Sequence, residues 1–240
     1  GLECLGSPTD EEAASHCRRY EHAVPQFSSD PREVDWSRPG GYDRSSWVYE
    51  PWSGESCGAW YEQTACFVRM VEPRLDDFDV LSFQFSYLEV NAGSSIDDEP
   101  GGFFAGRARG SGVSDLEAFE ARHPDKTVIY WTSSLARGIG SADAERFNDQ
   151  MRAYAAARGK VLFDVADILS HDPAGRPCFD NRDGIPYAGP GQAEDHPDDG
   201  LDLPAICQHY TTEANGGHLG SISVGKIRVA KAFWVLMARL

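Results

Sequence analysis

The apolar positions of this chain fall into two patterns, unbroken runs and runs with helical spacing. Three unbroken runs are rich in β-branched and aromatic residues and predict buried strands, at 78–91 (FDVLSFQFSYLEVN), 126–134 (KTVIYWTSS) and 160–169 (KVLFDVADIL). Helical spacing predicts helices over 59–72, 114–124, 141–159 and 221–240. Strands that alternate with helices in this way predict an α/β fold of three layers, α/β/α, with helices on both faces of a mainly parallel sheet.

Local signals predict where several of these helices begin and end. Ser141 is the expected N-cap and Gly159 the expected stop of one helix, and Pro73 ends another. Ser114 with Glu117 has the spacing of a capping box. In the last helix the positions expected to face the core are Val224, Ile227, Ala230, Phe233, Trp234 and Met237.

The regular pattern covers only part of the chain. We expect a single domain over 1–240, in which 1–75 is an irregular loop and helix region and 76–240 is the regular α/β part. Two long segments, 28–58 and 170–208, carry turn residues without a sustained period. Ordered loops of this length usually serve function or are braced by disulfides.

The charge balance limits the classes of partner. Lys and Arg total 22 against 38 Asp and Glu, a formal net charge of -16. Nucleic acids and anionic membranes both require a basic surface, so neither is an expected partner. No apolar run reaches the ~18 residues of a membrane span, so we expect no membrane insertion. The opening GLECLG lacks the basic start of a signal peptide and indicates a mature or trimmed product.

Six cysteines indicate an exported, disulfide-containing protein. None forms a Cys-x-x-Cys pair, and no histidine follows at zinc spacing. The sequence-local pairing that we favour is Cys4–Cys17, Cys57–Cys66 and Cys178–Cys207, since each bond would staple a loop-rich segment. The alternative is buried free thiols in a cytosolic protein.

The order of elements, together with the strand ending in TSSLAR, the strand VLFDVADIL and the turn GGHL before a final helix, resembles the SGNH/GDSL hydrolase superfamily. The resemblance covers roughly 78–169 and 208–240. It implies a three-layer α/β/α fold and esterase, lipase or carbohydrate deacetylase activity. It also implies a serine nucleophile, an oxyanion hole with an asparagine, and an Asp-x-x-His pair before the last helix.

Carried over to this chain, the resemblance implies that His218 is the general base. Asn215 stands at the position of the family's aspartate, and Asn91 falls near that of the oxyanion asparagine. An asparagine can orient an imidazole but cannot offset its positive charge, which Glu213 or an acid of 194–202 would have to do. The alternative for His218 is a polar residue at the start of a helix, bonded to backbone.

The nucleophile has no Gly-Asp-Ser motif to mark it. Ser56 lies in GESCG (54–58), which fits Gly-x-Ser-x-Gly, and Ser7 is a second weak candidate. The central strand that should carry the serine lies either upstream of Gly1 or in disguise within 1–60, because its neighbours would otherwise have unpaired buried backbone groups.

Two loop segments have further candidate chemistry. The acidic loop holds Asp195, Asp198, Asp199 and Asp202, whose oxygens are of the kind that calcium takes, with a solvated loop as the alternative. The Trp- and Tyr-rich segment 35–52 either stacks on sugar rings or folds its aromatics into a satellite core.

Two functional hypotheses follow. The first is a secreted hydrolase that acts on a small-molecule or carbohydrate ester and requires no cofactor. The second is a non-catalytic extracellular protein that keeps the scaffold for binding or surface assembly. The oligomeric state has no signature in the sequence.

Overall fold

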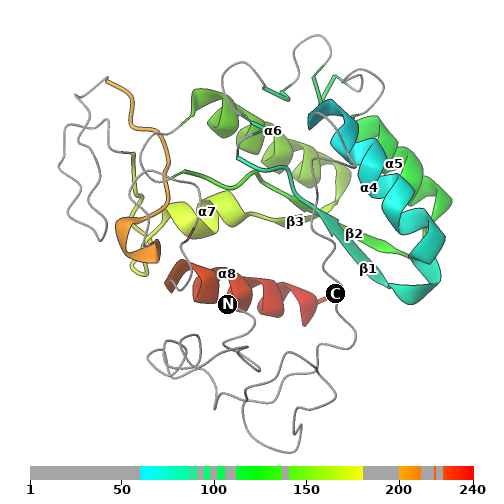
Figure 1. Cartoon of the computed structure of the whole chain (residues 1–240). Helices are drawn as coiled ribbons and strands as arrows, with labels where there is room; N and C mark the ends of the chain where they lie inside the picture. The colour runs from blue at the N-terminus through cyan, green and yellow to red at the C-terminus, as the bar shows by residue number, and fades with distance from the viewer. Residues whose placement is uncertain are drawn as a thin grey trace, which may run out of the picture.

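The computed structural model describes residues 60–87, 89–90, 95–97, 102–105, 112–136, 141–180, 200–211, 219 and 224–240 (Figure 1). Within these ranges lie three parallel strands in the order β1-β2-β3: β1 (Val80–Phe83), β2 (Thr127–Trp131) and β3 (Val161–Phe163). Val80 is paired with Thr127, and Ile129 with Val161. The predicted α/β class with a parallel sheet is therefore confirmed.

The helices of the described part are as follows: η2 (Trp60–Glu62), α4 (Gln63–Val71), η3 (Glu72–Asp77), α5 (Val113–Arg122), α6 (Ala142–Arg158), α7 (Val165–Ser170), η5 (Gln208–Tyr210) and α8 (Val224–Met237). Figure 1 shows α6 on one side of the strands and α8 on the other. α5 and α6 are the crossovers between consecutive parallel strands.

The two faces of the sheet have separate hydrophobic clusters. Val128 and Tyr130 point to the cluster that α4, α5 and α6 cover, and Ile129 points to the cluster that α7 and α8 cover. This alternation follows from the two-residue period of a strand. Because helices cover both faces, residues along β2 are apolar at successive positions.

All three predicted strands are too long, and the one predicted over 126–134 ends at Trp131. The strand predicted over 78–91 ends at Phe83, and the one predicted over 160–169 ends at Phe163, after which α7 begins. Asp164 causes the break after Phe163, because its carboxylate accepts a hydrogen bond from Asp167 N at 3.1 Å and caps α7. An apolar run cannot by itself separate a strand from a short buried helix.

The predicted helix ends are right at α6 and shifted at α5. Ser141 Oγ accepts from Ala144 N at 3.2 Å, and Gly159 takes a left-handed conformation at φ 63°. At α5 the N-cap is Gly112, whose amide donates to Asp115 Oδ2 at 2.6 Å, so the prediction of Ser114 as cap is wrong by two residues.

The last helix packs largely as predicted. Ile227 and Ala230 are buried, but Trp234 is 47 % exposed, so its predicted place in the core is wrong. The region 221–223 lies outside the described residues.

The disulfide Cys178–Cys207 is confirmed. Cys66 is also disulfide-bonded, with a partner outside the described residues, which leaves the predicted Cys57–Cys66 pair a prediction. Cys4 and Cys17 both lie outside the described residues.

Candidate functional site

The polar residues that follow the strands meet at one edge of the sheet, because parallel strands end on the same side. Thr132 directly follows β2, and Asp164 directly follows β3. Thr132 Oγ1 donates to Asp164 Oδ1 at 3.0 Å and accepts from Ala166 N at 3.0 Å. This buried hydroxyl therefore ties the end of β2 to the first turn of α7.

Asp164 is held from a second direction by α6. Arg152 Nε donates to Asp164 Oδ2 at 2.7 Å and Arg152 Nη2 donates to Asp164 Oδ1 at 3.1 Å. Two parallel bonds from a guanidinium to a carboxylate fix the orientation of both groups. The carboxylate therefore has a single position relative to β2, α6 and α7.

The next residue after β2 is also fixed through its backbone. Asn148 of α6, which is buried, accepts from Ser133 N at 2.7 Å and donates to Ser133 O at 3.4 Å. Ser133 Oγ donates to Ser134 O at 3.2 Å. The side-chain amide of Asn148 thus satisfies both backbone hydrogen-bonding groups of Ser133.

Gln84 occupies the corresponding position after β1. Its Nε2 donates to Thr132 O at 3.2 Å, and its side chain is exposed. A hydrogen-bonded chain of side chains and backbone thus runs along the edge from Gln84 through Thr132 and Asp164 to Arg152.

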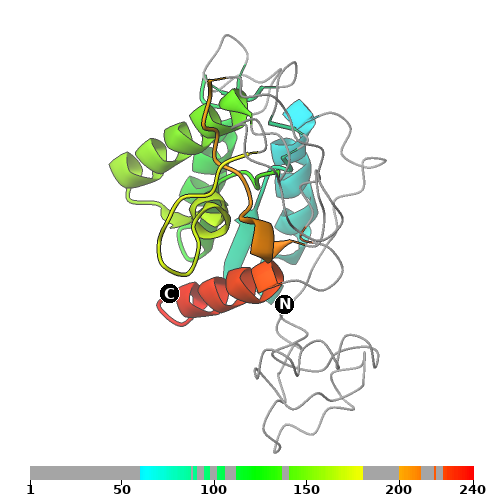
Figure 2. The ribbon, with the colours of Figure 1, turned by 90° about the vertical axis from the view of Figure 1, so that its left-hand side faces the viewer.

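The segment 200–211 reaches the same edge from the far end of the chain. Ile206 N donates to Ala136 O at 2.9 Å, and Cys207 N donates to Leu169 O at 2.9 Å. The disulfide from Cys207 to Cys178 adds a covalent link. Figure 2 shows this segment in orange, running toward the first turn of α8.

Two residues on either side of His218 in the chain, Tyr210 and Leu219, both lie against Gly225 of α8. A Cβ at Gly225 would lie 2.5 Å from Tyr210 O and 2.9 Å from a methyl carbon of Leu219, so only glycine fits here. Tyr210 and Leu219 also belong to the apolar cluster that contains Leu135 and Ile206. Tyr210 and Leu219, which lie on either side of His218 in the chain, are therefore both beside the first turn of α8.

Tyr210 and α8 are held by polar contacts as well. Tyr210 Oη donates to His171 O at 2.9 Å, and Arg228 Nε donates to Ile168 O at 2.8 Å. The Arg228 guanidinium also lies 5.1 Å from the centre of the Tyr210 ring. These contacts fix the start of α8 against α7.

His209 has a perturbed titration next to this turn. Partial burial lowers the pKa of His209 below its ordinary value of 6.5; the negative charge of Asp172 opposes this, and the positive charge of Arg228 adds to it. The lowered pKa favours the neutral form of this imidazole.

The site residues predicted from the sequence, His218, Asn215, Asn91 and Ser56, all lie outside the described residues, as does Ser7. Sequence reasoning missed Gln84, Thr132 and Asp164. The signal that marks them is a polar residue directly after the β-branched and aromatic part of each run. The predicted strands were extended through these positions, which hid them.

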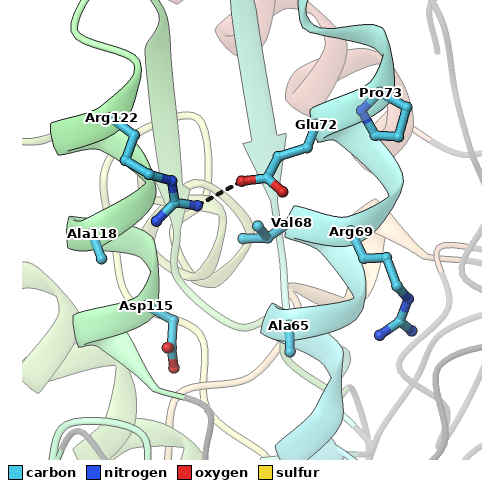
Figure 3. A pocket seen from close by; sticks show the side chains of 8 residues that line it. All are labelled: Ala65, Val68, Arg69, Glu72, Pro73, Asp115, Ala118 and Arg122. Carbon is cyan, nitrogen blue, oxygen red and sulfur yellow. Dashed lines mark hydrogen bonds and ion pairs between the residues drawn. The ribbon is translucent and has the colours of Figure 1, made fainter.

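One hollow of the described part lies elsewhere, between α4 and α5 (Figure 3). It has a volume of about 420 Å³ and is lined by Ala65, Val68, Arg69, Glu72, Pro73, Asp115, Ala118 and Arg122. Arg122 Nη2 pairs with Glu72 Oε1 at 2.6 Å, as the dashed line in Figure 3 marks. Asp115 Oδ2 accepts a hydrogen bond from Gly112 N. No residue of a strand end lines this hollow.

The described residues contain no candidate metal-binding site. Among these residues no three His, Cys, Asp or Glu side chains lie together in a way that could hold an ion. Of the acidic loop, Asp202 is described and exposed, whereas Asp195, Asp198 and Asp199 lie outside the described residues.

Across the described ranges, every helix is too short or too polar to cross a membrane. The fold and the strand-end residues define the chain as an α/β protein with a polar edge at the carboxyl ends of a parallel sheet. In comparisons with protein-family models, curated proteins and solved structures, nothing matches the chain.

Proposed function

We propose that the protein is a hydrolase that cleaves an ester, with His218 as its general base. The observation that carries the proposal is the anchoring of both Tyr210 and Leu219 at Gly225, within the apolar cluster that also contains Leu135 of the segment after β2. Leu219 is the direct neighbour of His218 in the chain. In open parallel sheets, ligands bind at the carboxyl ends of the strands.

The proposed chemistry is acyl transfer through a serine. The imidazole of His218 takes the proton of the serine hydroxyl and later returns it to the leaving alcohol. Asn215, three residues earlier, orients the imidazole. Ser56 and Ser7 are the candidate nucleophiles within this chain.

The substrate class that we propose is an acyl ester, including one carried by a carbohydrate. The aromatic segment 35–52 would supply flat apolar side chains for sugar rings. The disulfide Cys178–Cys207 supports export, because such bonds persist in oxidising compartments.

A fluorophosphonate probe tests the proposal on the full chain. The probe phosphorylates a serine only where a base activates its hydroxyl, so we expect labelling of the wild type and, by peptide mass spectrometry, one labelled serine. In His218→Ala, labelling disappears and kcat/KM on p-nitrophenyl acetate falls by about 10²–10⁴-fold.

The matched control is His123→Ala, which removes a histidine at the end of α5. It should keep both labelling and turnover. Absence of labelling and turnover in the wild type would refute the hydrolase and favour a binding protein that retains the scaffold.

A further inference from the structure

We infer that Gln84 is a substrate-contacting residue whose side-chain amide donates a hydrogen bond to the ester carbonyl oxygen as it becomes an oxyanion. The inference rests on the proposed function, and it assigns a role to a residue that sequence reasoning missed. It also moves the amide donor from Asn91 to the end of β1.

Gln84 lies at the carboxyl end of β1. β1 ends at Phe83, so Gln84 is the first residue beyond the carboxyl end of the strand, whereas Asn91 lies eight residues beyond Phe83. Within the described residues β1 has a neighbouring strand on one side only, which is β2. The central strand expected to carry the serine would pair on the other side, next to Gln84.

The backbone around Gln84 is held in place by its two neighbours. Phe83 and Phe85, on either side of Gln84, are in edge-to-face contact at 4.8 Å between ring centres. Phe85 is 3 % exposed and also packs against Phe103 and Phe147. With both neighbours anchored in the core, the backbone at Gln84 is held while its side chain stays exposed.

A hydrogen bond to backbone restricts the side-chain amide of Gln84. A primary amide has two N–H donors, and one of those on Gln84 Nε2 is directed at Thr132 O at 3.2 Å. That bond restricts the positions of the amide nitrogen at the end of β1. The second N–H remains for a ligand, and a donor held near its working position needs less reorganisation to stabilise a developing charge.

Thr132, whose carbonyl accepts the hydrogen bond from Gln84, is itself held by hydrogen bonds. Thr132 is held through its hydroxyl by Asp164 Oδ1 at 3.0 Å and Ala166 N at 3.0 Å, and Asp164 is held by Arg152. Thr132 and Asp164 are therefore positioning residues, which orient the group that touches substrate. The same post-β2 segment meets 200–211 through Ala136 O and Ile206 N.

In the proposed reaction, Gln84 acts while the serine adds to the ester carbonyl. The serine oxygen forms a bond to the carbonyl carbon, the π pair moves to the carbonyl oxygen, and the serine proton passes to His218. Gln84 donates to that negatively charged oxygen. When the intermediate collapses, the bond to the alcohol breaks and the alcohol leaves with the proton from His218; water then repeats the sequence on the acyl-enzyme.

The test compares Gln84→Ala and Gln84→Glu with Gln150→Ala, using the full chain and p-nitrophenyl acetate. Gln84→Glu keeps the shape of the side chain but has no N–H, and Gln150→Ala removes a glutamine from α6. Both Gln84 variants should lower kcat by about 10²–10³-fold with KM nearly unchanged. Their melting temperatures should equal that of the wild type, and Gln150→Ala should keep its kcat.

The positioning role has its own readout. Thr132→Ser keeps the hydroxyl and should retain kcat, whereas Thr132→Val should lower kcat more than it changes KM. A Gln84→Ala kcat within about twofold of wild type, in an enzyme that His218→Ala inactivates, would overturn the role of Gln84 and leave the hydrolase standing. A wild type without turnover would overturn both.

Discussion

Single residues determine how closely the segments of this edge approach one another. At Gly225 the missing side chain lets Tyr210 O and Leu219 lie against α8. At Thr132 one hydroxyl serves as donor to Asp164 and acceptor from Ala166 N, so both of its hydrogen-bonding functions are used. Each position tolerates little change, because the neighbouring atoms belong to backbone that is itself held.

The prediction at this scale concerns Gly225→Ala. The new Cβ would lie 2.5 Å from Tyr210 O, so the segment around Tyr210 has to shift. We expect a loss of about 1–3 kcal/mol in the free energy of unfolding, measured by urea denaturation. On the proposed function, ester turnover falls too.

Lys231→Ala, at an exposed position of the same helix, is the control and should change stability by less than about 0.5 kcal/mol. A Gly225→Ala protein as stable as this control would contradict the close approach.

Two helix caps of this molecule differ in whether they also make tertiary contacts. Asp164 caps α7 through Asp167 N and at the same time accepts from Thr132 and Arg152. Ser141 caps α6 through Ala144 N alone. The two caps have the same local role, but only Asp164 links three separate elements.

A comparison of Asp164→Ala with Ser141→Ala tests this difference. Loss of the Ser141 cap should cost about 1 kcal/mol of unfolding free energy. Loss of Asp164 should cost about 2–3 kcal/mol, because the buried Thr132 hydroxyl also loses its acceptor. Urea denaturation of both variants in one buffer is the measurement, and equal losses would show that the tertiary contacts of Asp164 contribute nothing.

At the scale of the whole molecule, the disulfide Cys178–Cys207 ties the segment after α7 to the segment before η5. Its sequence separation of 29 residues spans the acidic loop. A covalent link of this kind narrows the unfolded ensemble and keeps 200–211 at the edge of the sheet.

The double variant Cys178→Ala/Cys207→Ala should therefore lose roughly 3–4 kcal/mol of unfolding free energy, as expected for a closed loop of this length. Denaturation without reductant keeps the Cys66 disulfide intact in the wild type and in the double variant. The difference in unfolding free energy between them then reports the Cys178–Cys207 bond. A loss below about 1 kcal/mol would mean that the noncovalent contacts of 200–211 hold the segment alone.

The sequence by itself determined the features that depend on near neighbours. The α/β class, the strand at Thr127–Trp131, both ends of α6 and the Cys178–Cys207 pair were all predictable, because apolar runs, caps, a stop glycine and cysteine spacing act locally. His218 and Asn215 remain predictions from a resemblance.

Only the tertiary structure decided where the three strands end, that Trp234 is exposed, and which polar residues meet at the strand ends. Gln84 bonds to a residue 48 positions away, and Thr132 to one 32 positions away. No local pattern encodes such a pairing, because it depends on parallel strands that end side by side although they are far apart in the sequence.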